Sequence, residues 1–454
     1  MEQRQNRSSG CSNFLTQIVS TQSHFCAGGL SVPSTFNSSV IFLASDATRN
    51  EQSIFMHFLQ RRPSSLTKLL QTGSPVPALP NHFFGGFTDA VIFEDQHLGF
   101  VGMGNLSAPL PQRLFGAYVM AHADRSERTL HKVADTTDPT PVTPSRRFRS
   151  VSTPAIYSAE QDIFAAFAGS DARSGGRELI VRWRLSTRQQ TVLLDSSQSG
   201  LTRLSSPQIC QADVPLGRSS RWLLFFATSA NGEPGVWSLA LDDSSSGGGG
   251  PLPAASSALS GLRRLVAPTD AVPGATTPQT FSAFGAPVAA CGGSGGLALF
   301  LATGTRGSDG IYAAAVSHFA PLRRLVDTTS TPRGSTARFS GFPHSPTAAS
   351  GLVVFYAAVA GGGDNGVGSS RGDDGSRSSS SNGGGGSGLY AMRLQGMETR
   401  GSGEPFAVAT LASTNLSYLI AGYAGFDGRC LAFYGSDTKS DGLWSVEVQT
   451  QQAS

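Results

Sequence analysis

Short apolar runs recur along the chain, each bounded by turn-forming residues such as Gly, Pro, Ser, Asp or Asn. The seven clearest runs are VIFL from Val40, LGFV from Leu98, IFAAF from Ile163, LLFF from Leu223, LALFL from Leu297, LVVFY from Leu352 and CLAFY from Cys430. Runs this short, with turn residues on both sides, are typical of strands buried on both faces. The pattern therefore predicts an all-β protein.

Each apolar run is preceded by two apolar residues spaced by three. These pairs are Phe84 and Phe87, Phe148 and Val151, Leu201 and Leu204, Phe281 and Phe284, Phe339 and Phe342, and Leu416 and Leu419, with a degenerate copy between Phe25 and Leu30. A repeated aromatic pair could form a ligand platform. Because the pair recurs in nearly every repeat, we favour a role in the core between repeats.

Two further signatures follow each apolar run. The first is a small residue, an aliphatic and usually an aromatic, with copies that begin at Gly116, Gly235, Gly310, Gly388 and Gly442 and weaker copies at Ser53 and Glu178. We expect its Gly to supply a positive φ in a turn before a strand. The second is L-x-x-[VIL]-[VAL], with copies that begin at Leu66, Leu130, Thr191, Leu262, Leu322 and Val408 and often end in a Pro-containing turn.

Four strand signatures in a fixed order match one blade of a β-propeller, which has four antiparallel strands. The blades are expected over residues 23–81, 82–145, 146–200, 201–277, 278–336, 337–415 and 416–454 plus 13–22. The last repeat lacks its fourth signature, but residues 15–21, LTQIVST, fit it well. The sequence therefore predicts a closed seven-bladed β-propeller, in one domain over residues 13–454, whose last blade is completed by an N-terminal strand.

Two segments of low complexity interrupt the repeat. Residues 243–257 and 361–387 are rich in Gly and Ser and fall between predicted strands, so we expect disordered loops. The second holds the tripeptide Arg371-Gly372-Asp373, which chance explains in a segment of this composition. Residues 1–12 are expected to form a disordered tail.

Composition and charge limit the classes of partner. The net charge of +3 over 454 residues does not indicate nucleic-acid binding. No apolar run approaches the roughly 18 residues of a membrane span, and the polar start of the chain shows no secretory signal, so the sequence assigns no compartment. The odd count of five cysteines, without CxxC spacing, favours neither a zinc site nor a disulfide framework. Cys430 lies in an apolar run and is expected to be a buried free thiol.

No motif in the chain names a reaction. The G-x-S-x-G match at residues 292–296 is a Gly-rich turn without the strand and helix of a nucleophile elbow. The eight histidines show no metal-ligand spacing, so we expect them on the surface or in loops. The turn before Trp444 is faintly similar to the Asp-box of sialidases, but its spacing is wrong. The sequence therefore leaves any catalytic residues unassigned, and we predict no cofactor and no metal.

Charged residues recur at the fourth signature. Basic residues occur there as Lys68, His131-Lys132, Arg263-Arg264 and Arg323-Arg324, and acidic residues follow as Asp135, Asp195 and Asp327. The basic residues could bind an acidic partner, but we favour protection of the outer edge strand of each blade. The acidic residues could bind a cation, but we favour acceptance of backbone N–H groups in the turn.

The repeat resembles a family of tandem-repeat propeller proteins of bacteria and algae, with units of the form GIY…LxxVADTxTP…FxxF. The best match runs from Gly310 to Phe342, and blades three and six depart from the pattern. The resemblance implies the fold but no catalytic residues. We therefore expect a non-enzymatic binding or scaffold propeller, a monomer whose partner is a protein. The alternative is a carbohydrate-active propeller, either lectin-like or sialidase-like.

Overall fold

The computed structural model describes most of the predicted propeller. The described residues are 16–20, 25–30, 33–36, 39–46, 49, 51–59, 66–94, 96–104, 114–159, 161–171, 176–214, 218–241, 261–290, 296–316, 320–349, 351–360, 387–394, 404–410, 416–426, 430–437 and 441–448. The predicted tail, the insert at 243–257, the tripeptide at 371–373 and all of the second insert except Ser387 lie outside these ranges. None of the helices within them is long or apolar enough to cross a membrane.

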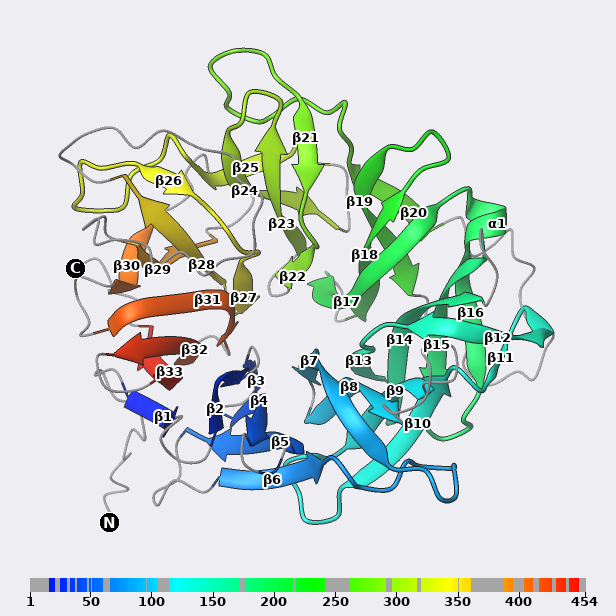
Figure 1. Cartoon of the computed structure of the whole chain (residues 1–454). Helices are drawn as coiled ribbons and strands as arrows, with labels where there is room; N and C mark the ends of the chain where they lie inside the picture. Colours follow the sequence, from blue (N-terminus) through cyan, green and yellow to red (C-terminus); the bar gives the residue numbers. More distant parts are fainter. Residues whose placement is uncertain are drawn as a thin grey trace, which may run out of the picture.

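The described residues form seven antiparallel sheets arranged in a ring (Figure 1). Blade one contains β2 (Phe25–Leu30), β3 (Ser34–Phe36), β4 (Ser39–Asp46), β5 (Glu51–Phe58) and β6 (Leu66–Gln71). Blade two contains β7 (Phe84–Glu94), β8 (His97–Gly104), β9 (Leu114–Ala121) and β10 (Thr129–Asp135). Blade three contains β11 (Pro139–Thr140), β12 (Thr143–Val151), β13 (Ala155–Ala159), β14 (Asp162–Asp171), β15 (Glu178–Arg184) and β16 (Gln190–Asp195), followed by α1 (Ser196–Ser199).

The remaining blades repeat this order. Blade four contains β17 (Thr202–Val214), β18 (Arg218–Thr228), β19 (Pro234–Leu241) and β20 (Leu262–Val266). Blade five contains β21 (Phe281–Phe284), β22 (Val288–Ala290), β23 (Leu297–Gly304), β24 (Asp309–Ala315) and β25 (Arg323–Asp327). Blade six contains β26 (Phe339–Gly341), β27 (Thr347–Ala349), β28 (Leu352–Val359), β29 (Gly388–Arg393) and β30 (Phe406–Thr410). Where the first strand of a blade is broken by an irregularity, its two halves carry separate labels, as in β21 and β22.

Blade seven joins the two ends of the described chain. It contains β31 (Leu416–Phe426), β32 (Cys430–Asp437) and β33 (Asp441–Glu447), and its fourth strand is β1 (Thr16–Ser20). β1 pairs antiparallel with β33, with Thr16 opposite Ser445 and Ser20 opposite Gly442. Ile18 packs against the apolar cluster between blades one and seven. The predicted seven-bladed ring and its closure by an N-terminal strand are therefore confirmed.

The core is divided into seven clusters of buried apolar side chains, one between each pair of neighbouring blades. The apolar runs of the sequence supply the centres of these clusters because each second strand contributes side chains to both of its sheet faces. In blade five, for example, Phe300 packs toward blade four and Leu299 toward blade six. Each blade is therefore held by both neighbours.

The aromatic residues of three signatures meet in one cluster. In blade five, Phe281 lies 5.0 Å from Tyr312 with ring planes at 86°, and Phe300 stacks on Tyr312 at 6.0 Å. Phe284 lies 5.3 Å from Phe281. Blades two and six repeat this arrangement with Phe84, Phe87, Phe100 and Tyr118, and with Phe339, Phe342, Phe355 and Tyr390. The Phe pairs therefore belong to the core, as favoured from the sequence.

The expectation that the signature Gly supplies a positive φ is wrong. Gly116, Gly235 and Gly310 lie within β9, β19 and β24, and none of them is among the glycines with a positive φ. A Cβ at Gly116 would lie 2.6 Å from the Tyr118 hydroxyl, and one at Gly310 would lie 2.9 Å from the Val326 carbonyl oxygen. The absence of a side chain lets the aromatic ring and the outer strand approach closely.

The expectation of a free thiol at Cys430 is also wrong. Cys430 in β32 and Cys210 in β17 are both fully buried, and each is disulfide-bonded. This bonding was not predictable, because the spacing of the five cysteines contains no local disulfide motif.

The antiparallel order of strands gives the ring two distinct faces. The connections between blades and the hairpins between second and third strands lie on one face, which we call the upper face. The hairpins between first and second strands and between third and fourth strands lie on the other, the lower face. In Figure 1, β22 and β27 lie close to the central channel, whereas β21 and β26 lie farther out.

Candidate functional site

The recurrent aspartates after the fourth strand close turns on the upper face. Asp327 Oδ1 accepts hydrogen bonds from the backbone N–H of Thr329 at 2.9 Å and from its hydroxyl at 2.7 Å. Asp135 does the same with Thr137, at 2.7 and 2.5 Å. Asp195 does so with Ser197, at 2.9 and 2.8 Å. The structure thus shows the turn role that the sequence favoured.

A basic side chain neutralises each of these aspartates. The closest nitrogen–oxygen distances are 3.1 Å for Lys132 and Asp135, 3.1 Å for Arg177 and Asp195, and 2.7 Å for Arg324 and Asp327. Burial alone would raise the pKa of Asp327, but the Thr329 hydroxyl, Arg324 and the Ser330 hydroxyl hold it below its ordinary value. The carboxylate therefore stays charged and stabilises the turn.

The basic residues of the fourth signature lie on the outermost strands, as the sequence predicted. Lys68, Lys132, Arg264 and Arg324 belong to β6, β10, β20 and β25, each of which ends the strand order of its sheet. Most of them bind groups of their own blade. Lys68 donates to Gln71 at 2.9 Å, and Arg264 lies 3.3 Å from Glu233. These residues are therefore largely used within the blades and do not form a free basic belt.

Uncharged residues make up the strands nearest the centre of the ring in blades one, three, five and six. The strands β3, β13, β22 and β27 have the sequences STF, AIYSA, VAA and TAA. None of the side chains described on these four strands is acidic or basic. Glycoside hydrolases use a pair of carboxylates across the bond that they cleave, and these strands do not supply one.

Two histidines lie together on the lower face of blade two, a feature that sequence analysis missed. The rings of His97 and His122 are 5.0 Å apart, and the backbone N–H of His122 donates to His97 Nδ1 at 3.1 Å. His97 is buried, as is His57 in blade one, so surface placement of all the histidines was a wrong expectation. Among the described residues, no group of three or more His, Cys, Asp or Glu is arranged to hold a metal ion.

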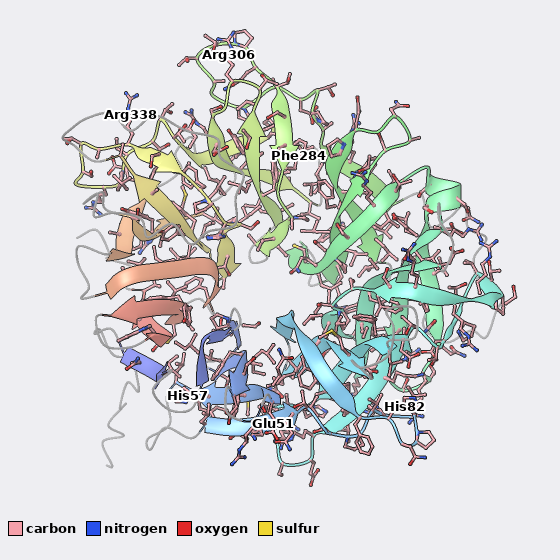
Figure 2. All side chains as sticks on the ribbon, viewed as in Figure 1. Glu51, His57, His82, Phe284, Arg306 and Arg338 are labelled. Carbon is pink, nitrogen blue, oxygen red and sulfur yellow. The ribbon has the colours of Figure 1, made fainter. Side chains whose placement is uncertain are left out.

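Arginine side chains without internal partners are spread over the upper face. Six exposed arginines, which we call the upper-face arginines, are Arg147, Arg149, Arg203, Arg306, Arg333 and Arg338. Arg147 and Arg149 flank buried Phe148 on β12, and Arg203 lies at the equivalent start of β17. In Figure 2, Arg306 and Arg338 point outward from blades five and six. No ion pair joins these six side chains to any residue in the described ranges.

The acidic residues of the upper face are, in contrast, engaged. Asp138 pairs with Lys132 at 2.7 Å, and Glu233 pairs with Arg264. Asp270 accepts a hydrogen bond from the backbone N–H of Ala267 at 2.8 Å, and Asp309 accepts one from the Thr303 hydroxyl at 2.7 Å. Among the described residues, the upper face of blades three to six therefore presents positive charge with little counter-charge.

Comparisons with known proteins assign no family to this chain. No protein-family model matches the chain, and no curated protein matches it. Among solved structures, the β-propeller domain of the Trilobed protease from Pyrococcus furiosus is similar over 92% of this chain and 95% of that chain, with 9% identity and a TM-score of 0.45. The acylaminoacyl peptidase of Pyrococcus horikoshii is similar over 92% of this chain and 52% of its own length, with 12% identity and a TM-score of 0.45.

Propellers with other functions are similar at the same level. The SapL1 lectin in complex with a methyl fucoside matches 75% of this chain and 95% of that chain, with 9% identity and a TM-score of 0.34. Similarities this low carry no argument about what this chain does.

Proposed function

We propose that this protein is a non-enzymatic binding propeller that holds an acidic protein partner on its upper face. One observation carries the proposal. The six upper-face arginines are exposed and form no ion pair within the described chain. The recurrent aspartates, in contrast, form ion pairs with basic residues of their own blades.

Exposed arginines suit recognition of carboxylates. A guanidinium group presents its donors in a planar fork that matches both oxygens of a carboxylate. A surface of one charge sign also attracts a partner of opposite sign from a distance, and this attraction weakens as salt is added. We therefore expect the partner to carry Asp- and Glu-rich segments and to associate faster at low ionic strength.

Comparison of the blades supports a local site. The two residues between the members of the apolar pair are Gly85-Gly86, Arg149-Ser150, Thr202-Arg203, Ser282-Ala283 and Ser340-Gly341 in blades two to six. Arginine occurs here only in blades three and four among these five. Because the packing of other blades does without it, Arg149 and Arg203 are free to serve binding, and we place the centre of the contact on these two blades.

The test compares two charge-reversal variants. R149E/R203E alters the upper face, and R125E/R188E makes the same change in net charge at exposed lower-face positions. The wild type, immobilised, is exposed to extract of the native cell, and bound proteins are identified by mass spectrometry. We expect acidic proteins that the wild type and R125E/R188E retain and that R149E/R203E loses, with retention falling as salt rises.

Immobilised poly-glutamate gives a second readout with a defined ligand. Binding by the wild type and R125E/R188E, with at least tenfold weaker binding by R149E/R203E, is expected. Equal loss in both variants would show that only net charge matters and would contradict a site on the upper face. Light scattering of the purified chain tests the accompanying proposal that the closed ring is a monomer.

A further inference from the structure

Cys210 and Cys430 are both disulfide-bonded, but they lie too far round the ring from each other to share one bond. Cys210 lies on β17 in blade four and packs in the cluster between blades four and five. Cys430 lies on β32 in blade seven, three blades further on. The partner of each is therefore one of the other three cysteines of the chain, Cys11, Cys26 and Cys291.

The strand that faces Cys210 limits its partner. β17 contacts β22 in blade five, and Ala289 of β22 packs in the same cluster as Cys210. Cys291 lies outside the described residues, but it comes two positions after Ala289, so the two Cα atoms are within about 7 Å of each other. Cys26 lies on β2 in blade one and Cys11 precedes β1 of blade seven, so neither belongs to a neighbour of blade four.

The level along the strands also agrees with Cys291. Cys210 pairs with Trp222, and Ala290 pairs with Leu297. Trp222 and Leu297 each lie three positions before the residue that pairs with the aromatic of the third strand, so Cys210 and Ala290 are at the same level of neighbouring blades. Cys291 directly follows Ala290 in the chain. It is therefore the cysteine within reach of Cys210.

Cys26 lies at the wrong level of blade one to meet Cys430. Phe25, the neighbour of Cys26, pairs with Asp46 at the upper end of β4. Cys430 corresponds to Ser39 at the lower end of β4, since both lie five positions before the residue that pairs with the start of the third signature. Seven strand residues separate these levels by about 23 Å. Bonded cysteines have Cα atoms no more than about 7 Å apart.

The chain before β1, in contrast, starts close to Cys430. Thr16, the first residue of β1, pairs with Ser445 in the lower half of β33, and Ser445 pairs with Ala432. Thr16 is therefore two strand spacings and two residues from Cys430, which is about 12 Å. Cys11, which lies outside the described residues, comes five positions before Thr16, and five residues span up to about 18 Å. Cys11 can thus reach Cys430.

We propose that the chain contains two disulfides, Cys11–Cys430 and Cys210–Cys291, and that Cys26 remains a thiol. The first bond fixes the segment before β1 to the second strand of blade seven, so the closing strand is held covalently as well as by its pairing with β33. The second bond joins blades four and five. Closure of the ring is then sensitive to redox conditions, independently of any partner on the upper face.

The chemistry of each bond is an exchange between thiols and a disulfide. Two protein thiols transfer two electrons and two protons to an oxidised disulfide, such as oxidised glutathione. The protein gains one S–S bond, and the oxidant leaves as two thiols. A dithiol reductant reverses the reaction, which releases the segment before β1 from blade seven.

Peptide mapping of the full wild-type chain tests the pattern directly. The unreduced chain is unfolded in the presence of an alkylating agent and digested with chymotrypsin, which cleaves after Phe14 and so separates Cys11 from Cys26. Mass spectrometry should find the two proposed links, with Cys26 alkylated. A link between Cys26 and Cys430 would overturn the proposal, as would an alkylated Cys430. This test requires no variant that has to fold.

The matched variants are Cys11→Ser and Cys26→Ser, which remove one cysteine each from the same part of the chain. C11S should lower Tm by about 3–8 °C, whereas C26S should change it little. With dithiothreitol present, wild type and C11S should melt together. Equal losses in both variants, or a C11S deficit that persists in dithiothreitol, would contradict a stabilising bond at Cys11.

The binding proposal for the upper face can fail or succeed separately. C11S and C26S keep all six upper-face arginines, so both should bind poly-glutamate as the wild type does. Conversely, R149E/R203E keeps all five cysteines and should show the same disulfide map as the wild type. A changed map in R149E/R203E would contradict a bond pattern that is set by the ring alone.

Discussion

Blades five and three build the same four-stranded unit in different ways. Blade five follows the repeat closely, with Gly310 and Tyr312 in its third strand and the aromatic cluster around Phe281. In blade three Leu179 pairs with Asp195 as Gly310 pairs with Asp327, so Leu179 and Val181 occupy these two positions, and a short helix, α1, replaces the Pro-containing turn. Both blades nevertheless close on an aspartate after the fourth strand.

Both blades keep an aspartate at the end of the fourth strand, where it accepts a backbone N–H of the following turn. Asp327 closes a turn with Thr329, whereas Asp195 caps α1 by accepting from the Ser197 N–H. The rest of the turn is therefore replaceable, and so is the aromatic ring of the third strand. Blade three uses this freedom to introduce Arg182 and Arg184 at positions where blade five buries Ala313 and Ala315. Departure from the repeat thus marks positions where charged side chains replace buried apolar ones.

The largest expected effect is on the aromatic cluster of blade five. Phe281→Ala removes a fully buried ring that contacts Phe284, Phe300 and Tyr312, and it should cost about 3–5 kcal/mol of unfolding free energy. Phe148→Ala in blade three should cost less, because among the described aromatic rings only Phe167 lies against it. Denaturant titration measures both, and equal losses would break the contrast between the blades.

A smaller effect is expected at the start of the third strands. Gly310→Ala places a Cβ 2.9 Å from the Val326 carbonyl oxygen, a backbone atom that cannot move aside cheaply, and should destabilise by about 1–3 kcal/mol. Glu178→Ala removes the acceptor of the Leu204 N–H at 2.9 Å and should cost about 1 kcal/mol. Thermal unfolding of both variants tests this order, and a stable G310A would refute the close-approach explanation.

Substitution of the turn aspartate should also cost more stability in blade five than in blade three. Asp327→Asn weakens contacts with Arg324 and Thr329 and should cost about 1–2 kcal/mol at neutral pH. Since the folded-state pKa of Asp327 lies below its unfolded value, its stabilisation is present above pH ~4 and is lost as pH falls through the folded pKa.

The gap between wild type and D327N should therefore narrow in acid. Asp195→Asn should cost less, up to about 1 kcal/mol at neutral pH, because asparagine caps a helix about as well as aspartate and only the ion pair with Arg177 is lost. Urea titrations at neutral and acidic pH measure both variants. A D327N deficit that stays constant with pH would contradict the charge-based role.

The smallest effect on stability is expected at the upper-face arginines. R149E/R203E changes exposed side chains without ion pairs in the described chain and should alter the unfolding free energy by no more than about 0.5 kcal/mol. The same variant should lose binding to poly-glutamate. If R149E/R203E lost both stability and binding to poly-glutamate, unfolding would explain the loss of binding. The result would then contradict a separate binding role for these arginines.

The role of a residue was predictable from the sequence where that role repeats in several blades. The Phe pairs, the edge-strand basic residues and the turn aspartates each recur in several blades, so their common purpose was visible without coordinates. The closing strand was predictable for the same reason, because residues 15–21 fit a signature that the last repeat lacks.

Features that occur once were not predictable in this way. His97 and His122 are 25 positions apart and meet only through the pairing of β8 with β9. Arg182 and Arg184 belong to a weak copy of their signature, so their inward position was hidden. The role of Gly310 depends on a carbonyl of the neighbouring strand, which no local pattern encodes.

The pairing of β1 with β33 also determines when the ring can close during synthesis. On the ribosome, β1 emerges before the six blades that separate it from its partner, and Ile18 has no cluster to enter until blade seven is made. Throughout synthesis the nascent chain must therefore keep this strand available and unpaired with any other edge. Contacts between such distant segments form slowly. The pairing of β1, which is synthesised early, with β33 is thus the last step in closing the ring.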